Sequence, residues 1–596
     1  MKLHGKILVI GMCLMMKTPL LFAQNVFLEL NLNNQSLPQH AVRPAASRTK
    51  LDILRVIERA AGDDRIKGIV LNVSAFGAGH ETMWELRQAL EEFRATGKKV
   101  VAFVSAAGLN LYHLATVADK IVMDDQGSLM LLGHAWGRGF ARRGLETLGV
   151  GVREMRYFEY KSAAESFTRD SLSDADRRQF GQWLDDVMSV TRKAITEARS
   201  WTSEEFYSIL NDEFLFSARS ALERGIVDAV GRRQAVIDAA RTLLNGEPDD
   251  EAAEKSPGKE PTFVVFGDPG TSVTGATQLY GPGRVTGSRR GRRPPVIAVI
   301  NANGVTDMER GIAARALARN IDELSRRARV RAIVLRINSP GGSPEAAAYV
   351  ADAVKRARER VPVVVSMGAV AASGGYWASM NANHIAASPM TITGSIGVIA
   401  TWFYDSGLND RLGLSVDVMQ RGNHADLMTG IILPRRDLNE TEQARFRRYI
   451  IDHYDCFVAR VAESRGMEIE RVEAVAQGRI FSGLGALEAG LIDSVGGLGH
   501  AIRVARELAG IPESQGVAFE QFPRPTFFDR MMGRLVKMGL PNRAALAGGL
   551  GASPAAAMMA DMFLPAHVLE DVHFRISNNG RAMPILPLDD IVGRGQ

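Results

Sequence analysis

Short apolar runs alternate with stretches of helical periodicity along most of this chain. The runs "GIVL" (68–71), "KVVAFV" (99–104), "AIVLRI" (332–337) and "VPVVVSM" (361–367) have the length and composition of strands buried on both faces. Turns that contain glycine connect several of these runs to amphipathic stretches. Strands that alternate with helices in this way predict parallel β-α-β units whose helices cover a sheet.

The pattern occurs twice. With a constant offset of 264, "RIKGIVLNVSAFGAGHETMWELRQAL" (65–90) aligns with "RVRAIVLRINSPGGSPEAAAYVADAV" (329–354). After a slip of one residue, "FSARSALERGIVDAVG" (216–231) aligns with "FSGLGALEAGLIDSVG" (481–496). The chain is therefore a duplicated domain, and we predict an α/β fold built from two homologous β-α domains in tandem.

The repeat also sets the predicted domain boundaries. The segment between the copies is rich in charge, glycine and proline, as expected for a flexible connection. The predicted parts are a signal or anchor segment (1–24), a first domain (25–244), a linker (245–295), a second domain (296–513) and an extension of unassigned role (514–596).

Composition narrows the functional classes. The chain has 596 residues, 46% of them hydrophobic, and a formal net charge of +5. Its one basic cluster, "GSRRGRRPP" (287–295), has no aromatic neighbours, so it predicts a solvated linker and no nucleic-acid partner. Cys13 and Cys456 are the only cysteines, so we expect neither a disulfide framework nor a cysteine-based metal site.

The N-terminus has the layout of an export signal or a short membrane anchor. Lys2 and Lys6 precede an apolar segment, which Lys17 interrupts before "TPLLFA". A complete membrane span needs about 20 mostly apolar residues and would here have to tolerate Lys17 and Pro19. We expect residues 1–24 to serve in export or anchoring.

The second copy carries a candidate nucleophile. Ser373 in "AASGGYW" (371–377) follows an apolar strand and precedes two glycines, and "NSPGGSPE" (338–345) forms another glycine turn after a strand. A glycine-rich turn that leads into a helix exposes backbone N–H groups, which an oxyanion hole requires. A serine at such a turn can present its hydroxyl to the same donors.

The first copy lacks this serine but contains a candidate base. It has Leu109 opposite Ser373, whereas Lys161 in "RYFEYKSAAESFTRDSLS" (156–173) aligns with Ala425, or with His424 if one gap is allowed. One copy has kept a serine and the other a lysine, which suggests one site divided across the duplication. Desolvation lowers the pKa of a buried lysine, so Lys161 could act as the general base for serine.

These segments resemble a known family. "LRINSPGGSPEAA", "VVVSMGAVAASGGYWAS", "TITGSIGV" and "YKSAAESFTRDSLS" are similar to the long form of the signal peptide peptidase A family, serine protease family S49, over roughly residues 27–510. The resemblance implies a ClpP/crotonase-like fold and a Ser–Lys dyad of Ser373 and Lys161. It further implies that Ser395 orients the lysine and that Gly342 and Gly374 stabilise the oxyanion. No cofactor or metal is implied.

The resemblance also implies where the protein acts and on what. Members are anchored in the bacterial inner membrane by the N-terminus, face the periplasm, form homotetramers and degrade released signal peptides and other unfolded hydrophobic peptides. Two other classes stay open: a crotonase-like acyl-thioester enzyme, which would need neither Ser373 nor Lys161, and a catalytically silent membrane scaffold. His384 and His424 lack the spacing of a triad or a metal site, so we interpret them as ordinary polar residues.

Overall fold

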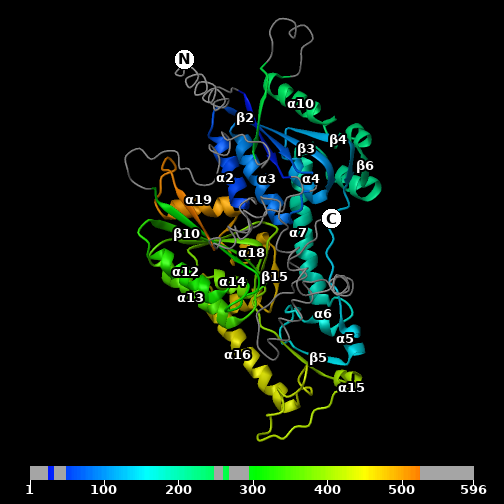
Figure 1. Ribbon diagram of the computed structural model, residues 1–596, viewed down its shortest axis with the longest axis vertical. Helices are drawn as coiled ribbons and strands as arrows, with labels where there is room; N and C mark the ends of the chain where they lie inside the picture. The colour runs from blue at the N-terminus through cyan, green and yellow to red at the C-terminus, as the bar shows by residue number, and fades with distance from the viewer. Residues whose placement is uncertain (1–24, 33–48, 75, 247–258, 267–293, 524–596) are drawn as a thin grey trace, which may run out of the picture.

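Two α/β units, one from each sequence copy, make up the described part of the chain (Figure 1). The computed structural model describes residues 25–32, 49–74, 76–246, 259–266 and 294–523. The predicted signal or anchor segment, 1–24, lies outside the described residues. Within the described ranges every helix is too short or too polar to cross a bilayer.

The first copy forms a mainly parallel sheet with the strand order β6-β4-β3-β2-β1-β8, in which β7 also pairs with β4. Its strands are β1 (Val26–Asn31), β2 (Ile66–Asn72), β3 (Lys99–Gly108), β4 (Lys120–Met130), β6 (Leu215–Ser217), β7 (Ala229–Val230) and β8 (Thr262–Phe266). Its helices are α2 (Lys50–Ala61), α3 (His80–Ala95), α4 (Leu109–Ala115), α5 (Arg142–Leu148), α6 (Glu165–Thr168), α7 (Asp174–Arg199), α8 (Ser203–Ser208), the π-helix η1 (Ile209–Glu213), α9 (Ala218–Glu223) and α10 (Arg233–Asn245).

The second copy repeats this order as β15-β13-β11-β10-β9-β17, with β12 paired to β11 and β16. Its strands are β9 (Val296–Asn303), β10 (Val330–Ser339), β11 (Val363–Ala372), β12 (His384–Ala387), β13 (Ile392–Gly394), β15 (Ile480–Phe481), β16 (Ser494–Val495) and β17 (Ala518–Phe522). Its helices are α12 (Ala314–Ser325), α13 (Pro344–Arg358), α14 (Gly374–Ser379), α15 (Leu408–Leu412), α16 (Glu440–Arg465), α17 (Ile469–Val475), α18 (Gly483–Glu488) and α19 (Leu498–Leu508).

Strand register confirms the duplication at the level of single residues. In the first sheet Leu129 of β4 pairs antiparallel with Phe216 of β6, and in the second Thr393 of β13 pairs antiparallel with Phe481 of β15. These are the partners that the offset of 264 and the later slip of one residue relate to each other. The predicted tandem α/β organisation is therefore present in the structure.

Both copies extend beyond the predicted boundaries. Strand β8 lies inside the predicted linker and pairs in parallel with β1, while β17 lies past residue 513 and pairs in parallel with β9. In the described part of each copy, an edge strand therefore follows the last described helix. These strands have five residues each and adjoin segments rich in charge, glycine or proline, so their apolar pattern is too short to stand out in the sequence.

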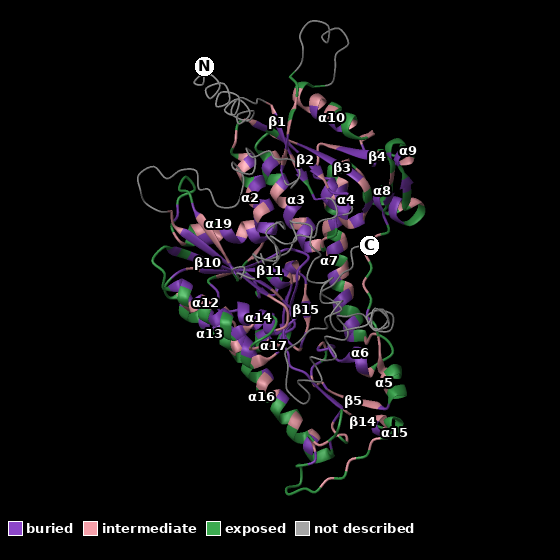
Figure 2. Ribbon diagram, in the orientation of Figure 1, coloured by how far each residue is buried: buried purple, intermediate pink, exposed green. Residues whose placement is uncertain are grey.

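The two units share one core. Helices α2 and α3 of the first copy and α19 of the second lie between the two sheets (Figure 1), and their buried faces form a single apolar cluster with strands of both copies. Figure 2 shows the central strands of both sheets as buried, while exposed residues lie on outer helices such as α5, α9, α15 and the far end of α16. Burial of apolar surface by both copies therefore fixes their relative position.

A separate two-stranded ribbon joins the copies far from the shared core. Strand β5 (Val150–Met155) of the first copy pairs antiparallel with β14 (Ala400–Asp405) of the second, from Met155 opposite Ala400 to Val150 opposite Asp405. The segment that carries Lys161 follows β5, and β14 begins shortly after Ser395. The ribbon therefore brings the two candidate segments to the same junction.

Candidate active site

Ser373 occupies the turn between β11 and α14. Its backbone has φ 57° and ψ −115°, a conformation that residues other than glycine rarely adopt. The N–H of Ser373 donates to the carbonyl of Gly394 at 2.7 Å, which ties the turn to the neighbouring strand β13. Such a sharp strand-to-helix turn directs the serine hydroxyl away from the sheet, as in a nucleophile elbow.

Lys161 lies on an irregular turn between β5 and α6. The N–H of the preceding residue, Tyr160, donates to the carbonyl of Gln477 in the second copy at 3.0 Å. Gly478 packs directly on the lysine, because a Cβ added there would lie 2.6 Å from the Cβ of Lys161. The second copy therefore holds the lysine backbone closely, and only glycine fits at residue 478.

The structure brings Lys161, Ser373 and Ser395 together. Lys161 Nζ lies 2.6 Å from Ser373 Oγ, 2.9 Å from Ser395 Oγ and 2.8 Å from the carbonyl oxygen of Ser395. Each of the three residues is at most 1% exposed. The proximity predicted from the divided duplication is thus present within one chain.

Burial lowers the pKa of Lys161 well below that of an ordinary lysine, because desolvation disfavours the ammonium ion. Among the described residues no carboxylate offsets this effect of burial on Lys161. The lysine side chain is therefore suited to accept a proton at moderate pH.

The two glycine turns meet next to Ser373. A Cβ placed on Gly374 would lie 3.2 Å from the backbone nitrogen of Gly342 and 3.1 Å from Thr306 Oγ1. Thr306 fixes the first turn through its backbone: its N–H donates to Gly341 O at 2.7 Å, and Ser343 N–H donates to Thr306 O at 2.7 Å. The backbone of Gly374, next to the candidate nucleophile, therefore packs against the backbone nitrogen of Gly342.

Sequence reasoning did not find Thr306 or Gly478. Thr306 acts through its backbone, in a loop outside both glycine motifs, so its side-chain type carried no signal. Gly478 lies in "AQGRIF" (476–481), just before the second segment of the internal repeat. A glycine so close to an aligned block is the one clue that the sequence offered.

The other candidates lie in ordinary structural settings. His384 contacts Ser494 Oγ at 2.7 Å, and His424 contacts Glu442 Oε1 at 2.7 Å, so neither contacts Ser373 or Lys161. Leu109, the first-copy equivalent of Ser373, is buried in the shared apolar core. The first copy therefore offers no second nucleophile at this position.

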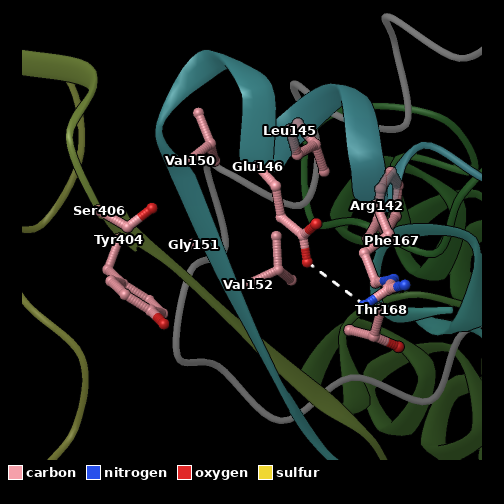
Figure 3. Close-up of a pocket in the computed structure, with 10 residues that line it drawn as sticks. All are labelled: Arg142, Leu145, Glu146, Val150, Gly151, Val152, Phe167, Thr168, Tyr404 and Ser406. Atoms are coloured by element: carbon pink, nitrogen blue, oxygen red, sulfur yellow. Dashed lines mark hydrogen bonds and ion pairs between the residues drawn. The ribbon is translucent and has the colours of Figure 1, made fainter. Parts of the chain in front are cut away.

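Among the described residues no group of three or more His, Cys, Asp or Glu side chains is arranged to hold a metal ion, and Cys456 is free and exposed. A crevice of about 300 Å³ lies at the β5–β14 ribbon (Figure 3). It is lined by Arg142, Leu145, Glu146, Val150, Gly151, Val152, Phe167, Thr168, Tyr404 and Ser406. None of these is a candidate catalytic residue, and the Arg142 and Glu146 side chains pair with each other at its edge.

Comparison with known proteins gives a family and several relatives. The family model Peptidase family S49 matches residues 92–246 and 355–512. Protease 4 of Salmonella typhi is 32% identical over 490 residues, which cover 81% of this chain and 75% of that protein. The chloroplastic serine protease SPPA of Arabidopsis thaliana is 29% identical over 476 residues, which cover 78% of this chain and 67% of that protein.

Among solved structures, a 1510-N membrane-bound stomatin-specific protease mutant in complex with a substrate peptide is 15% identical, with a TM-score of 0.26, and covers 41% of this chain and 99% of that chain. The family match spans both copies and agrees with the predicted fold class, a tandem pair of ClpP/crotonase-like α/β domains.

Proposed function

This chain belongs to peptidase family S49 and is a serine protease, and we propose that it cleaves peptide bonds with a Ser–Lys dyad formed by Ser373 and Lys161. The observation that carries the proposal is the 2.6 Å distance between Lys161 Nζ and Ser373 Oγ in a fully buried setting. Ser395 orients the amine, and the N–H groups of Gly342 and Gly374 form the oxyanion hole.

The contacts of Lys161 suit a neutral amine. A neutral lysine has two N–H donors and one lone pair. Its two donors are matched by the hydroxyl and carbonyl oxygens of Ser395, at 2.9 and 2.8 Å, which leaves the lone pair for the Ser373 hydroxyl proton. Both oxygens of Ser395 are thus used to aim the lone pair of the base at the nucleophile.

The reaction follows from this arrangement. Ser373 Oγ attacks the carbonyl carbon of the peptide bond while its proton passes to Lys161 Nζ. The negative charge that develops on the carbonyl oxygen is stabilised by the N–H groups of Gly342 and Gly374. Lys161 then protonates the leaving amine of the substrate. The neutral side chain of Lys161 next activates a water molecule, which hydrolyses the acyl-enzyme.

Unfolded hydrophobic peptides, released signal peptides among them, are the proposed substrates. Ser373, Lys161 and Ser395 are at most 1% exposed, so a folded protein cannot bring its backbone to the nucleophile without local unfolding. An extended segment can add its backbone to the turns at the strand ends. Signal peptides are produced at membranes, and the apolar N-terminal segment suits an enzyme anchored in a bacterial inner membrane with its catalytic domains in the periplasm.

A homotetramer is the proposed assembly, and the internal repeat supports it through one exposed surface. In the second copy Ile396 and Ile480 are 0% and 3% exposed, and each belongs to an apolar cluster that includes residues of the first copy. Their first-copy equivalents, Leu132 and Leu215, are 57% and 54% exposed. An apolar edge that is covered in one copy is thus open in the other.

The complementary surface lies on the second copy. The first-copy segment around Lys161 covers the second sheet edge, whereas the side-chain partners of its second-copy counterpart, 420–430, lie within the second copy among the described residues. Met419 and Met428 in and beside that segment are 94% and 71% exposed. Docking of this segment onto β4 and β6 of the next protomer would repeat the internal contact head to tail, and such contacts form a ring when the rotation between protomers closes.

Degradation of a synthetic signal peptide by the purified full-length protein tests the proposed function. We expect the intact enzyme to cut the peptide at internal bonds and Ser373→Ala to leave it whole while keeping the same thermal unfolding transition. A stable folded protein should resist both. Peptide cleavage by Ser373→Ala at the rate of the intact enzyme would refute the assignment of the nucleophile.

A further inference from the structure

A buried amide, Gln179 on α7, lies between the segments that supply the base and the nucleophile. Its side-chain nitrogen donates to the carbonyl of Tyr160 at 3.1 Å and to Ser162 Oγ at 3.2 Å, the residues on either side of Lys161. Its side-chain oxygen accepts from the N–H of Ile480 in the second copy at 3.1 Å. One side chain, 3% exposed, thus holds both flanks of the lysine turn and a strand of the other copy.

That strand leads directly to the other residues of the site. Ile480 pairs in the β13–β15 ladder with Gly394, whose carbonyl accepts from the N–H of Ser373 at 2.7 Å. The neighbouring carbonyl, of Arg479, accepts from the N–H of Ser395 at 2.7 Å. Three hydrogen bonds in series, at Ile480 N–H, Ser395 N–H and Ser373 N–H, therefore connect the amide oxygen of Gln179 with the backbone of the nucleophile.

The charged groups around Gln179 support the same geometry. Asp176, one turn earlier on α7, accepts from Gln179 Nε2 at 3.0 Å and from Ser162 Oγ at 2.6 Å, and it forms a buried ion pair with Arg138 at 2.9 Å. Arg138 also donates to the carbonyl of Ser162 at 3.0 Å. The lysine turn is thus held by donors and acceptors that are themselves fixed by α7.

We propose that Gln179 is a positioning residue that sets the distance between Lys161 and Ser373 across the junction of the two copies. The proposal rests on the Ser–Lys dyad proposed above. An amide is required because the position needs a donor toward the lysine turn and an acceptor toward Ile480 within one short group. Gln179 touches neither the substrate nor the reacting atoms and acts through the backbone on both sides.

Two variants separate the two halves of this link. Gln179→Met keeps the length of the side chain and removes both polar functions. Gln179→Glu keeps an acceptor for Ile480 N–H but loses the donor toward Tyr160 and faces Asp176 with a second carboxylate. Gln182→Met is the matched control, because Gln182 lies on the same helix, is exposed, and bonds only to Asp186 in the structure, at 3.1 Å.

The measurement is peptide hydrolysis by the full-length variants across a pH series, with the active fraction counted by fluorophosphonate titration of Ser373. We expect kcat of Gln179→Met and Gln179→Glu to fall on the order of 10²-fold, the loss expected when a reacting group is misplaced by about 1 Å, with KM unchanged. We also expect the pH inflection of kcat/KM to move upward, because a less confined Lys161 is better hydrated. Gln182→Met should match the unchanged enzyme.

Two kinetic results would overturn the positioning role: wild-type kcat and pH inflection of kcat/KM in both variants, or a lower active fraction with an unchanged pH inflection. Failure of both variants to fold would also overturn it, because Gln179 would then be needed only for the fold of the junction. A different result tests the Ser–Lys dyad itself. Wild-type hydrolysis by Lys161→Ala would refute the dyad, whereas an inactive Lys161→Ala with an unaltered Gln179→Met refutes only the role of Gln179.

Discussion

Lys161 of the first copy and Ser373 of the second lie with their Nζ and Oγ atoms 2.6 Å apart, although 212 positions separate them in the chain. The duplication explains how one chain builds such a site: each copy contributes a different member, and the equivalent residue in the other copy has a different type. Leu109 stands where the first copy would need its serine, and it packs in the core. The proposed site therefore exists only when the two copies are packed together.

The hydroxyl of Ser395 should matter less than the lysine it contacts. Ser395→Ala removes the acceptor 2.9 Å from Lys161 Nζ but leaves the carbonyl acceptor at 2.8 Å. The loss of one hydrogen bond worth about 1.5 kcal/mol predicts a decrease in kcat of roughly tenfold, with KM unchanged. Steady-state hydrolysis of a signal peptide measures this, and a variant as inactive as Lys161→Ala would show that Ser395 has a larger role.

A methyl group on Gly374 should block the proposed oxyanion hole. In Gly374→Ala the new Cβ would lie 3.2 Å from the backbone nitrogen of Gly342, in the space where the oxyanion is expected. We expect kcat to fall by about 10²-fold, the effect of losing one oxyanion-hole donor. Gly499→Ala on α19 is the control, because its Cβ meets only Arg503 Nη1 at 3.8 Å. Equal activity of the two variants would argue against an oxyanion hole at Gly374.

Arg336 should contribute strongly to the stability of the junction. It is 1% exposed and its guanidinium lies between Glu81 and Glu85 of the first copy, at 2.9 Å from Glu85 Oε1, while Lys50 pairs with the same acids. Arg336→Met leaves two buried carboxylates with one cation, so we expect the free energy of unfolding to fall by about 3–5 kcal/mol. Urea unfolding measures this.

Arg331→Met is the control for that measurement, because Arg331 lies on the same strand, β10, and is exposed. We expect its urea midpoint to match that of the unchanged protein. If Arg336→Met also kept the wild-type midpoint, the buried ion cluster would not hold the two copies together.

Acid should destabilise the first copy through its buried histidines. Burial lowers the pKa of His113 well below that of an ordinary histidine and lowers the pKa of His134 to about 3. The unfolded chain binds these protons near pH 6.5 and the folded chain does not, so stability is complete above about pH 6.5 and falls as the pH decreases toward the folded pKa values.

The variant His113→Leu isolates one of these protons. Neither ring nitrogen of His113 has a hydrogen-bond partner among the described residues, so leucine removes an unpaired polar group from the core. Between about pH 6 and pH 4 the loss of stability should be shallower than in the unchanged protein by about 1.4 kcal/mol per pH unit. Urea unfolding at several pH values measures the slopes, and identical slopes would show that His113 does not stay neutral in the folded state.

The sequence predicted the elements of the fold that occur in both copies, and it predicted the two site residues that occur in only one copy each. The aligned runs gave the central strands of both sheets, because buried parallel strands have a strong apolar signal. Lys161 and Ser373 were predicted because neither has a residue of the same type at the equivalent position of the other copy. Comparison of the two copies within one chain thus identified Lys161 as a candidate base. A single copy would have indicated only a surface lysine.

The rest depended on contacts that no local pattern encodes. The carbonyl of Ser395 and the backbone of Thr306 act through groups that every residue has, so their residue types gave no signal. Gln179 is one polar residue among many on a long amphipathic helix, and only packing of the copies shows that it meets Ile480. Strands β8 and β17 are too short for their pattern to be recognised in charged surroundings.

The rate at which a fluorophosphonate labels Ser373, measured against pH in the wild type, Lys161→Ala and Lys161→Arg, tests the Ser–Lys dyad most directly. Because burial lowers the pKa of Lys161 and its neutral form is the base, the wild-type rate should rise with pH through an inflection well below the pKa of an ordinary lysine. Both variants, folded by circular dichroism, should label more slowly by a factor on the order of 10² to 10⁴, since neither alanine nor a protonated guanidinium can accept the proton. Labelling of either variant at the wild-type rate would contradict the dyad.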